Sequence, residues 1–126
     1  MKTRRRFMML VTAAAGSLAL TGAALLASPG GAAGTKPTVV RLGEYFYRPG
    51  TVTVRVGQPV VFVNVGKIEH TVADTDARGN IRSRLIKPHP LAHGARQQVV
   101  FRHPGTVHYL CTFHPTLMRG RIVVRR

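Results

Sequence analysis

The chain has 126 residues, of which 44% are hydrophobic, and this length fits one domain and excludes a large multidomain enzyme. Thirteen glycines, eight prolines and no tryptophan favour a compact β-rich fold over a helical bundle or a disordered chain. The single cysteine, Cys111, excludes an internal disulfide, so any role it has is that of a thiol, a thiolate or a metal ligand. Nineteen basic residues against four acidic ones give a net charge of +15, which raises an anionic surface or a nucleic acid as a candidate partner.

The first residues carry the pattern of an export signal. A basic run, Lys2 to Arg6, precedes an apolar run over residues 7–27, as in secretory signals. The segment from Thr3 to Met8 also resembles the twin-arginine motif, which implies export in the folded state. An ordinary secretory signal and a retained membrane anchor are the alternatives. We therefore expect an export signal over residues 1–33, an extracytoplasmic location in the periplasm or outside the cell, and membrane contact only if the signal is uncleaved.

Removal of residues 1–33 takes away one lysine and three arginines and lowers the net charge from +15 to +11. Residues 34–38 predict a flexible leader, and residues 39–126 predict a single domain. Export argues against a nucleic acid as the partner. We expect a monomer whose surface stays strongly basic.

From Thr38 onward, apolar residues recur at every second position, which is typical of strands with one buried face. The expected strands cover residues 52–56, 60–65, 70–73, 98–102, 106–111 and 121–125. The polar stretch 74–96 is expected mostly as loop, with residues 81–86 as its candidate strand. Five aromatic residues are expected in the core: Tyr45, Phe46, Tyr47, Phe62 and Phe101. Short strands separated by turns predict an all-β fold, an antiparallel Greek-key β-sandwich.

Two separated segments contain residues that bind soft metal ions. His70 lies at the start of a short predicted strand, and the run that begins at Cys111 adds His114 and Met118. Two histidines and one cysteine with a long axial methionine form the ligand set of a blue-copper electron-transfer site. In this arrangement one strand end and a tight loop supply three ligands, while the fourth arrives from a neighbouring strand. A geometry fixed in this way keeps the reorganisation cost of electron transfer low.

These segments resemble those of the cupredoxin family, in particular its small plastocyanin-like and amicyanin-like members. The resembling blocks run in the family's order and are Tyr45–Pro49, Val52–Gly57, Val60–Asn64, His70–Val72, Pro104–Thr106, Tyr109–Cys111 and Met118–Val124. The resemblance implies one copper ion that cycles between Cu(I) and Cu(II), bound by His70, Cys111, His114 and Met118, with His114 nearest the surface. Two positions depart from the family. Thr71 stands where many relatives have asparagine, and three residues separate His114 from Met118 where close relatives have two or four.

The candidate ligands also have purely structural interpretations. Cys111 alone is typical of a buried small hydrophobe, and Met118 could pack in the core before the last strand. Four further histidines are surplus to the ligand set: His89, His93, His103 and His108. We expect solvated loop residues at positions 89 and 93, with a secondary metal site as the alternative. His108 is expected to point away from Cys111, because side chains alternate along a strand.

The sequence predicts an exported one-electron carrier rather than an enzyme, with His114 as its electron port beside the apolar residues Phe113, Pro115 and Leu117. The expected partner is a redox protein with an acidic docking surface, attracted by the basic charge. A copper-binding or copper-delivery protein is the alternative, since it would use the same ligands without a tuned potential. Copper enzymes such as nitrite reductases are disfavoured, because they need a second copper centre with additional histidines.

Overall fold

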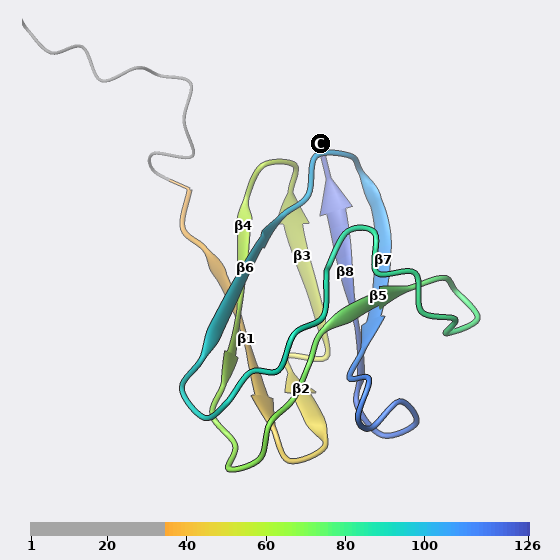
Figure 1. Cartoon of the computed structure of the whole chain (residues 1–126). Helices are drawn as coiled ribbons and strands as arrows, with labels where there is room; N and C mark the ends of the chain where they lie inside the picture. Colours follow the sequence, from red (N-terminus) through yellow and green to blue (C-terminus); the bar gives the residue numbers. More distant parts are fainter. Residues whose placement is uncertain (1–34) are drawn as a thin grey trace, which may run out of the picture.

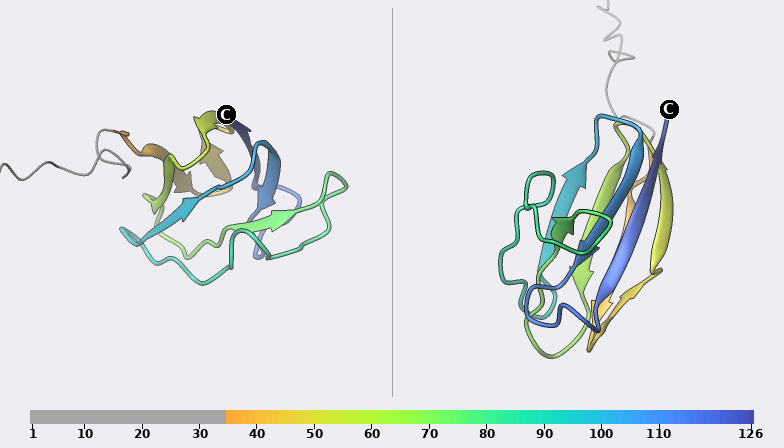
Figure 2. Two further views of the ribbon diagram at one scale, coloured as in Figure 1. Left: turned by 90° about the horizontal axis from the view of Figure 1, so that it is seen from above. Right: turned by 90° about the vertical axis from the view of Figure 1, so that its right-hand side faces the viewer.

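The computed structural model describes residues 35–126, so the predicted export signal lies outside the described residues. Within this range the chain forms eight strands and no helix, and hence nothing there could cross a membrane as a helix. The strands make two four-stranded sheets, which lie face to face (Figures 1 and 2). The predicted all-β sandwich is confirmed.

The first sheet has the order β2-β1-β4-β6. Its strands are β1 (Thr38–Gly43), β2 (Phe46–Arg48), β4 (Pro59–Asn64) and β6 (Arg96–Val100). β1 and β4 are parallel, whereas β2 and β6 are antiparallel to their neighbours. The parallel pair arises because the chain leaves this sheet after β2, builds β3 in the other sheet and re-enters beside β1.

The second sheet has the order β3-β8-β7-β5. Its strands are β3 (Thr51–Arg55), β8 (Arg119–Arg125), β7 (Gly105–Leu110) and β5 (Ala73–Thr75). β3 and β8 are parallel, and the other pairs are antiparallel. Both sheets are therefore mixed, and the antiparallel pairing expected throughout the sandwich is wrong for β1–β4 and β3–β8. Alternation in the sequence reports which face of a strand is buried, but it does not report the direction of the neighbouring strand.

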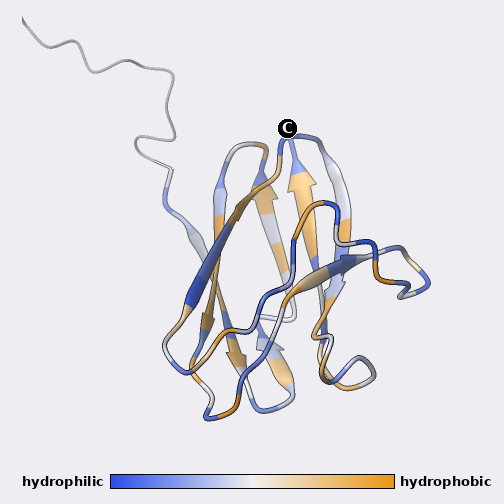
Figure 3. Ribbon diagram, in the orientation of Figure 1, coloured by the Kyte–Doolittle hydropathy of each residue, from blue (hydrophilic) through white to orange (hydrophobic). Residues whose placement is uncertain are grey.

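The core lies between the sheets and consists of inward-facing residues from both. On β3 and β8 the alternation places Val54, Ile122 and Val124 inside, each at most 3% exposed. Tyr109 and Cys111 face the same interior, as predicted, and are at most 1% exposed. Figure 3 shows apolar and polar segments alternating along these strands. The predicted inward positions of these segments are confirmed except at Val56, which lies just past the end of β3 and is 39% exposed.

Two strand expectations differ from the structure. The predicted strand over residues 70–73 is reduced to an isolated bridge between His70 and Leu91, and β5 begins only at Ala73. Residues 81–86 form no strand, and Ile81 makes only a single bridge to Thr75. Both segments are short and lack a continuous neighbour, so local β propensity is not enough to extend a ladder.

Only three of the five aromatic residues expected in the core are buried. Tyr47, Phe62 and Phe101 are buried, whereas Phe46 is half-buried and Tyr45 is 50% exposed. Tyr45 takes a φ of 69° in the turn between β1 and β2, and this left-handed conformation interrupts the alternation. The expectation that Tyr45 is a core residue is therefore wrong.

Candidate metal centre

Three of the four predicted ligands meet at one end of the sandwich, the lower end in Figure 1. The ligand atoms of His70, Cys111 and His114 all lie within 4.8 Å of one another. Cys111 Sγ is 3.7 Å from His114 Nδ1 and 4.0 Å from His70 Nδ1. Within residues 35–126 this is the one group of three or more histidine, cysteine or acidic side chains gathered this closely. We call this end of the molecule the metal end.

Cys111 follows directly after β7, and the ladder with β8 continues past it. The Cys111 N–H donates to the Met118 carbonyl at 3.1 Å, which closes residues 112–117 into a tight loop. Inside the loop, the His114 N–H donates to the Cys111 carbonyl at 3.2 Å and the Met118 N–H to the His114 carbonyl at 3.0 Å. The loop therefore holds the His114 backbone at a fixed place beside the cysteine sulfur.

His70 is held by a second set of hydrogen bonds, and its side chain is fully buried. Its N–H donates to the Leu91 carbonyl at 3.2 Å, and the Leu91 N–H donates back at 2.8 Å. The buried Asn64 amide donates to the carbonyls of Ile68 and Leu91 at 2.8 and 2.7 Å, and its oxygen accepts the Gly66 N–H at 2.8 Å. Asn64 thus fixes both segments that position His70, because every polar group of its amide is used.

Thr71 connects the His70 segment to the ligand loop. Its backbone N–H lies 3.4 Å and its hydroxyl 3.7 Å from Cys111 Sγ. The same hydroxyl accepts the Thr112 N–H at 2.8 Å and lies 2.8 Å from the Thr112 hydroxyl. Donors directed at a thiolate stabilise its negative charge. Thr71, which departs from the family's asparagine, therefore bridges the two segments with its hydroxyl.

Tyr47 supports Thr71 from the core. Its hydroxyl donates to the Thr71 carbonyl at 2.6 Å. Burial raises the pKa of Tyr47 far above its ordinary value, and the nearby Cys111 charge adds to the shift. Tyr47 consequently stays protonated at neutral pH and can donate this hydrogen bond.

His114 is half-buried and reaches the surface among apolar side chains. Phe113 and Leu117 are 51% and 65% exposed, as the sequence predicts for a rim around the port. Tyr45 completes this rim, since its ring packs edge-on against the His114 ring with centroids 4.9 Å apart. The sequence carries no signal for this contact, because it depends on the left-handed turn at Tyr45.

The electrostatics favour a metal-binding form of His70. Burial lowers its pKa, and repulsion from His114 lowers it further, while Glu44 acts weakly in the opposite direction. The neutral imidazole is the form that binds a metal ion. The Glu44 carboxylate accepts the N–H groups of Ile68 and Lys67, and these hydrogen bonds lower its pKa. Glu44 thereby ties the β1–β2 turn to the loop that leads to His70.

The donor set and its spacing fit a copper ion. Metal–sulfur and metal–nitrogen bonds of about 2.0–2.3 Å at 120° would separate the two donor atoms by about 3.8 Å, close to the observed 3.7 and 4.0 Å. One thiolate with two imidazoles is the planar set of a blue-copper site. Met118 is fully buried in the core cluster that also contains Cys111, and its assignment as the fourth ligand stays a prediction.

The surplus histidines stay outside this group. His93 is exposed, and its Nδ1 pairs with the Gly66 carbonyl at 2.7 Å. His89 and His103 are exposed, and His108 is half-buried opposite Arg121.

Comparison with known proteins gives a consistent result. Residues 35–125 match the model of the copper binding proteins of the plastocyanin/azurin family. Amicyanin-alpha of Methylorubrum extorquens is 28% identical over 118 residues, which cover 94% of this chain and 95% of the relative. A purple cupredoxin from Nitrosopumilus maritimus superposes with a TM-score of 0.65 at 27% identity, over 69% of this chain and 98% of the other. A copper-containing nitrite reductase from Thermus scotoductus gives 0.62 at 26% identity, over 72% of this chain but only 23% of the enzyme.

The family match spans nearly all of the described residues and includes the segments that carry the thiol and both imidazoles. The cofactor is accordingly copper, and the chain belongs to the plastocyanin/azurin family of copper-binding cupredoxins.

Proposed function

We propose that the protein is a type 1 copper protein that carries single electrons between redox partners and catalyses no reaction itself. The observation that carries the proposal is the gathering of one thiol and two imidazoles within 4.8 Å. We assign the ligands as His70, Cys111, His114 and Met118. Bound copper supplies a one-electron couple, Cu(I)/Cu(II), and the protein supplies a site in which little has to move.

The ligands and the residues around them have different roles in electron transfer. His70 and Cys111 are buried and hydrogen-bonded, so they hold the same positions in both oxidation states. His114 is the ligand that reaches the surface, and electrons would enter and leave through it. Phe113 and Leu117 exclude water around it and offer an apolar surface on which a partner can pack closely.

A visible absorption spectrum of the protein with Cu(II) tests the proposal. A thiolate bound to Cu(II) in this geometry gives an intense blue charge-transfer band. We expect this band in the wild type and its loss in Cys111→Ser. A colourless Cu(II) complex of the wild-type protein would contradict the carrier function.

Two substitutions test Met118. If its sulfur is a weak axial donor, Met118→Leu keeps the blue colour and raises the reduction potential, because losing a donor disfavours Cu(II) more than Cu(I). Met118→Gln lowers the potential. If Met118 only packs in the core, the potential stays the same and the glutamine costs about 2 kcal/mol of stability through an unpaired buried amide. Potentials and unfolding curves of both variants separate these cases.

We also propose that the carrier works as a monomer outside the cytoplasm and meets a redox protein with an acidic docking surface. The support for the location is the sequence of residues 1–33, with the arginine pair Arg4-Arg5. Replacing both arginines by lysine keeps the charge and should stop export by the twin-arginine route. Unchanged export of this variant would point to an ordinary secretory signal.

A further inference from the structure

The two ends of the sandwich differ in charge. At the metal end, Glu44 and Glu69 are exposed next to Lys67 in the loops around His70, and the Arg119 guanidinium is bonded to the Pro115 carbonyl at 2.7 Å. The metal end therefore carries charged side chains of both signs. The two remaining acidic residues of the chain, Asp74 and Asp76, lie in β5 and the turn after it.

The opposite end, where β3 and β8 finish and β7 begins, is entirely basic. We call it the cationic cap, and it consists of the exposed residues Lys36, Arg55, Arg102, His103, Arg125 and Arg126. None of the four acidic residues of the chain belongs to it. The one lysine and four arginines of the cap therefore have no acidic side chain near them.

Backbone contacts bring the cap together from four segments. Arg55 lies opposite Arg125 in the ladder, and its guanidinium donates to the Arg126 carbonyl at 3.2 Å. The Gln58 amide donates to the Lys36 carbonyl at 3.1 Å. The Gly57 N–H donates to the Phe101 carbonyl at 2.9 Å. Arg102 directly follows Phe101 in the sequence and therefore lies at the same end of the sandwich.

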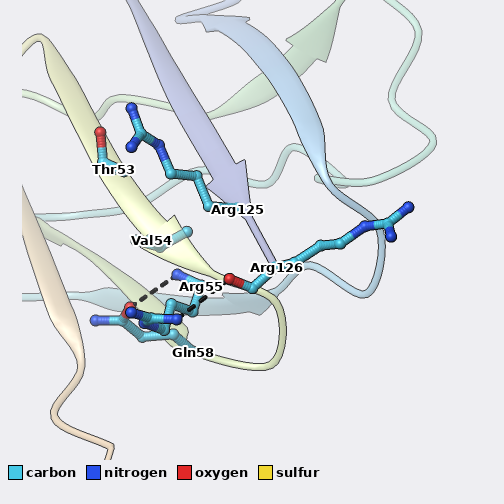
Figure 4. A pocket seen from close by; sticks show the side chains of 6 residues that line it. All are labelled: Thr53, Val54, Arg55, Gln58, Arg125 and Arg126. Carbon is cyan, nitrogen blue, oxygen red and sulfur yellow. Dashed lines mark hydrogen bonds between the residues drawn. The ribbon is translucent and has the colours of Figure 1, made fainter.

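The cap contains a hollow between β3 and β8 (Figure 4). Its volume is about 330 Å³, and its lining residues are Thr53, Val54, Arg55, Gln58, Arg125 and Arg126. Three of these six side chains are guanidinium groups and none is a carboxylate. Guanidinium groups bind phosphate oxygens in a bidentate manner. In Figure 4 the guanidinium groups of Arg125 and Arg126 point in different directions, so the hollow offers several separate basic groups to phosphate oxygens and not one closed site.

The cap is too far from the copper ligands to serve the electron partner. β8 spans seven residues between the two ends, which at about 3.3 Å per residue is a separation of about 20 Å. A protein bound at the cap would thus not touch His114. A partner bound at the cap would therefore leave the His114 port free.

We propose that the cationic cap docks the protein on anionic phospholipid headgroups, with His114 facing the solution. Basic residues that cluster next to a membrane attract anionic lipids. The chain enters β1 at this end, because Lys36 is bound there through Gln58. The apolar run of residues 7–27 stands just before this point in the sequence, so the cap would be the end nearest a membrane that holds this run. The inference goes beyond electron carriage and does not depend on it.

Co-sedimentation of the full chain with lipid vesicles tests the docking. The measured quantity is the ratio of binding to vesicles with phosphatidylglycerol over binding to pure phosphatidylcholine. The basic run Lys2 to Arg6 also favours anionic vesicles, but it is the same in the wild type and both variants, so the difference among the three proteins measures the cap. The cap variant is Arg55→Gln, Arg125→Gln, Arg126→Gln. The matched control, Arg41→Gln, Arg48→Gln, Arg96→Gln, removes the same charge from exposed positions in the first sheet.

We expect the ratio to fall about 100-fold in the cap variant and less than fivefold in the control, with the copper spectrum of both unchanged. An equal fall in both variants would show that net charge alone acts, and this would overturn the proposal. The absence of any preference for anionic vesicles in the wild type would overturn it too. Saturable binding of inorganic phosphate without that preference would assign the hollow to a free anion and reject the membrane contact.

Discussion

The metal end and the cationic cap are built from the same strands, yet they hold their functional groups in opposite ways. At the metal end, His70, Thr71 and Cys111 are at most 2% exposed and joined by hydrogen bonds. At the cap, arginine side chains extend into solvent with few bonds (Figure 4). A metal site needs donor atoms fixed within fractions of an ångström, whereas attraction to a charged surface needs only the right sign at the right end.

This difference predicts that stability and spectrum respond to changes at the metal end and not at the cap. Gly120→Ala should have the largest effect. A methyl group at this position would collide with the Tyr109 ring, which is buried against Tyr47 and Phe62. We expect the free energy of unfolding, measured with denaturant, to fall by about 3 kcal/mol.

Gly50→Ala is the control for this substitution, because the nearest atom to its added methyl lies at an ordinary 3.8 Å. A loss at Gly120 no larger than that at Gly50 would show that the core around Tyr109 can adapt.

Thr71→Val should have the next largest effect. It removes the hydroxyl near Cys111 Sγ and leaves the Thr112 N–H without its acceptor. An unsatisfied buried donor costs about 2 kcal/mol, and the Cu(II) absorption maximum should shift as the sulfur loses a neighbour. Thr53→Val, at an exposed position in the cap hollow, should change neither quantity. Equal responses at both threonines would remove the distinction between the two ends.

Tyr47→Phe and Tyr109→Phe form a pair in which the same atom is removed. The Tyr47 hydroxyl is bonded to the Thr71 carbonyl, so its loss should cost about 1 kcal/mol. The Tyr109 hydroxyl is buried with no hydrogen-bond partner within residues 35–126, so its removal should leave stability unchanged or raise it. Thermal unfolding of both variants measures the difference in stability. A larger loss of stability in Tyr109→Phe than in Tyr47→Phe would contradict the assignment of the stabilising hydrogen bond to Tyr47.

We expect the smallest effect on stability at Asp76, in the turn after β5, which belongs neither to the metal end nor to the cap. Hydrogen bonds from Asn80, Arg78 and Arg82 lower the pKa of Asp76 to about 2, from an ordinary 3.8. A carboxylate whose pKa is lowered by folding stabilises the fold above its ordinary pKa, and this contribution disappears as the pH falls towards 2. In Asp76→Asn, unfolding measured between pH 2 and pH 5 should show a smaller pH dependence. If the pH dependence of unfolding is the same in Asp76→Asn as in the wild type, Asp76 is not its source.

The sequence predicts the sandwich and the three gathered ligands because both follow from short-range patterns. Alternating valines specify the buried face of β3, and the spacing from Cys111 to His114 fits one tight loop. The parallel pairs are not predictable in this way, since they depend on where the chain re-enters a sheet. The contact between Tyr45 and His114 is not predictable from the sequence either. It depends on the positive φ of Tyr45, and a tyrosine in the sequence gives no indication of that conformation. The clustering of arginines at one end also requires the register of β3 and β8.

The position of β8 has a consequence for how the protein is made. β8 is an inner strand, between β3 and β7, and it pairs with residues 70 positions earlier, as the bond between Arg121 and Thr51 shows. While the ribosome is still translating residues 119–125, β3 and β7 have no strand between them, and such distant pairings form slowly. The bond from the Cys111 N–H to the Met118 carbonyl, which closes the ligand loop, extends the β7–β8 ladder, so the site is complete only once β8 has paired. A copper ion therefore meets a complete ligand loop only in a chain whose β8 has paired.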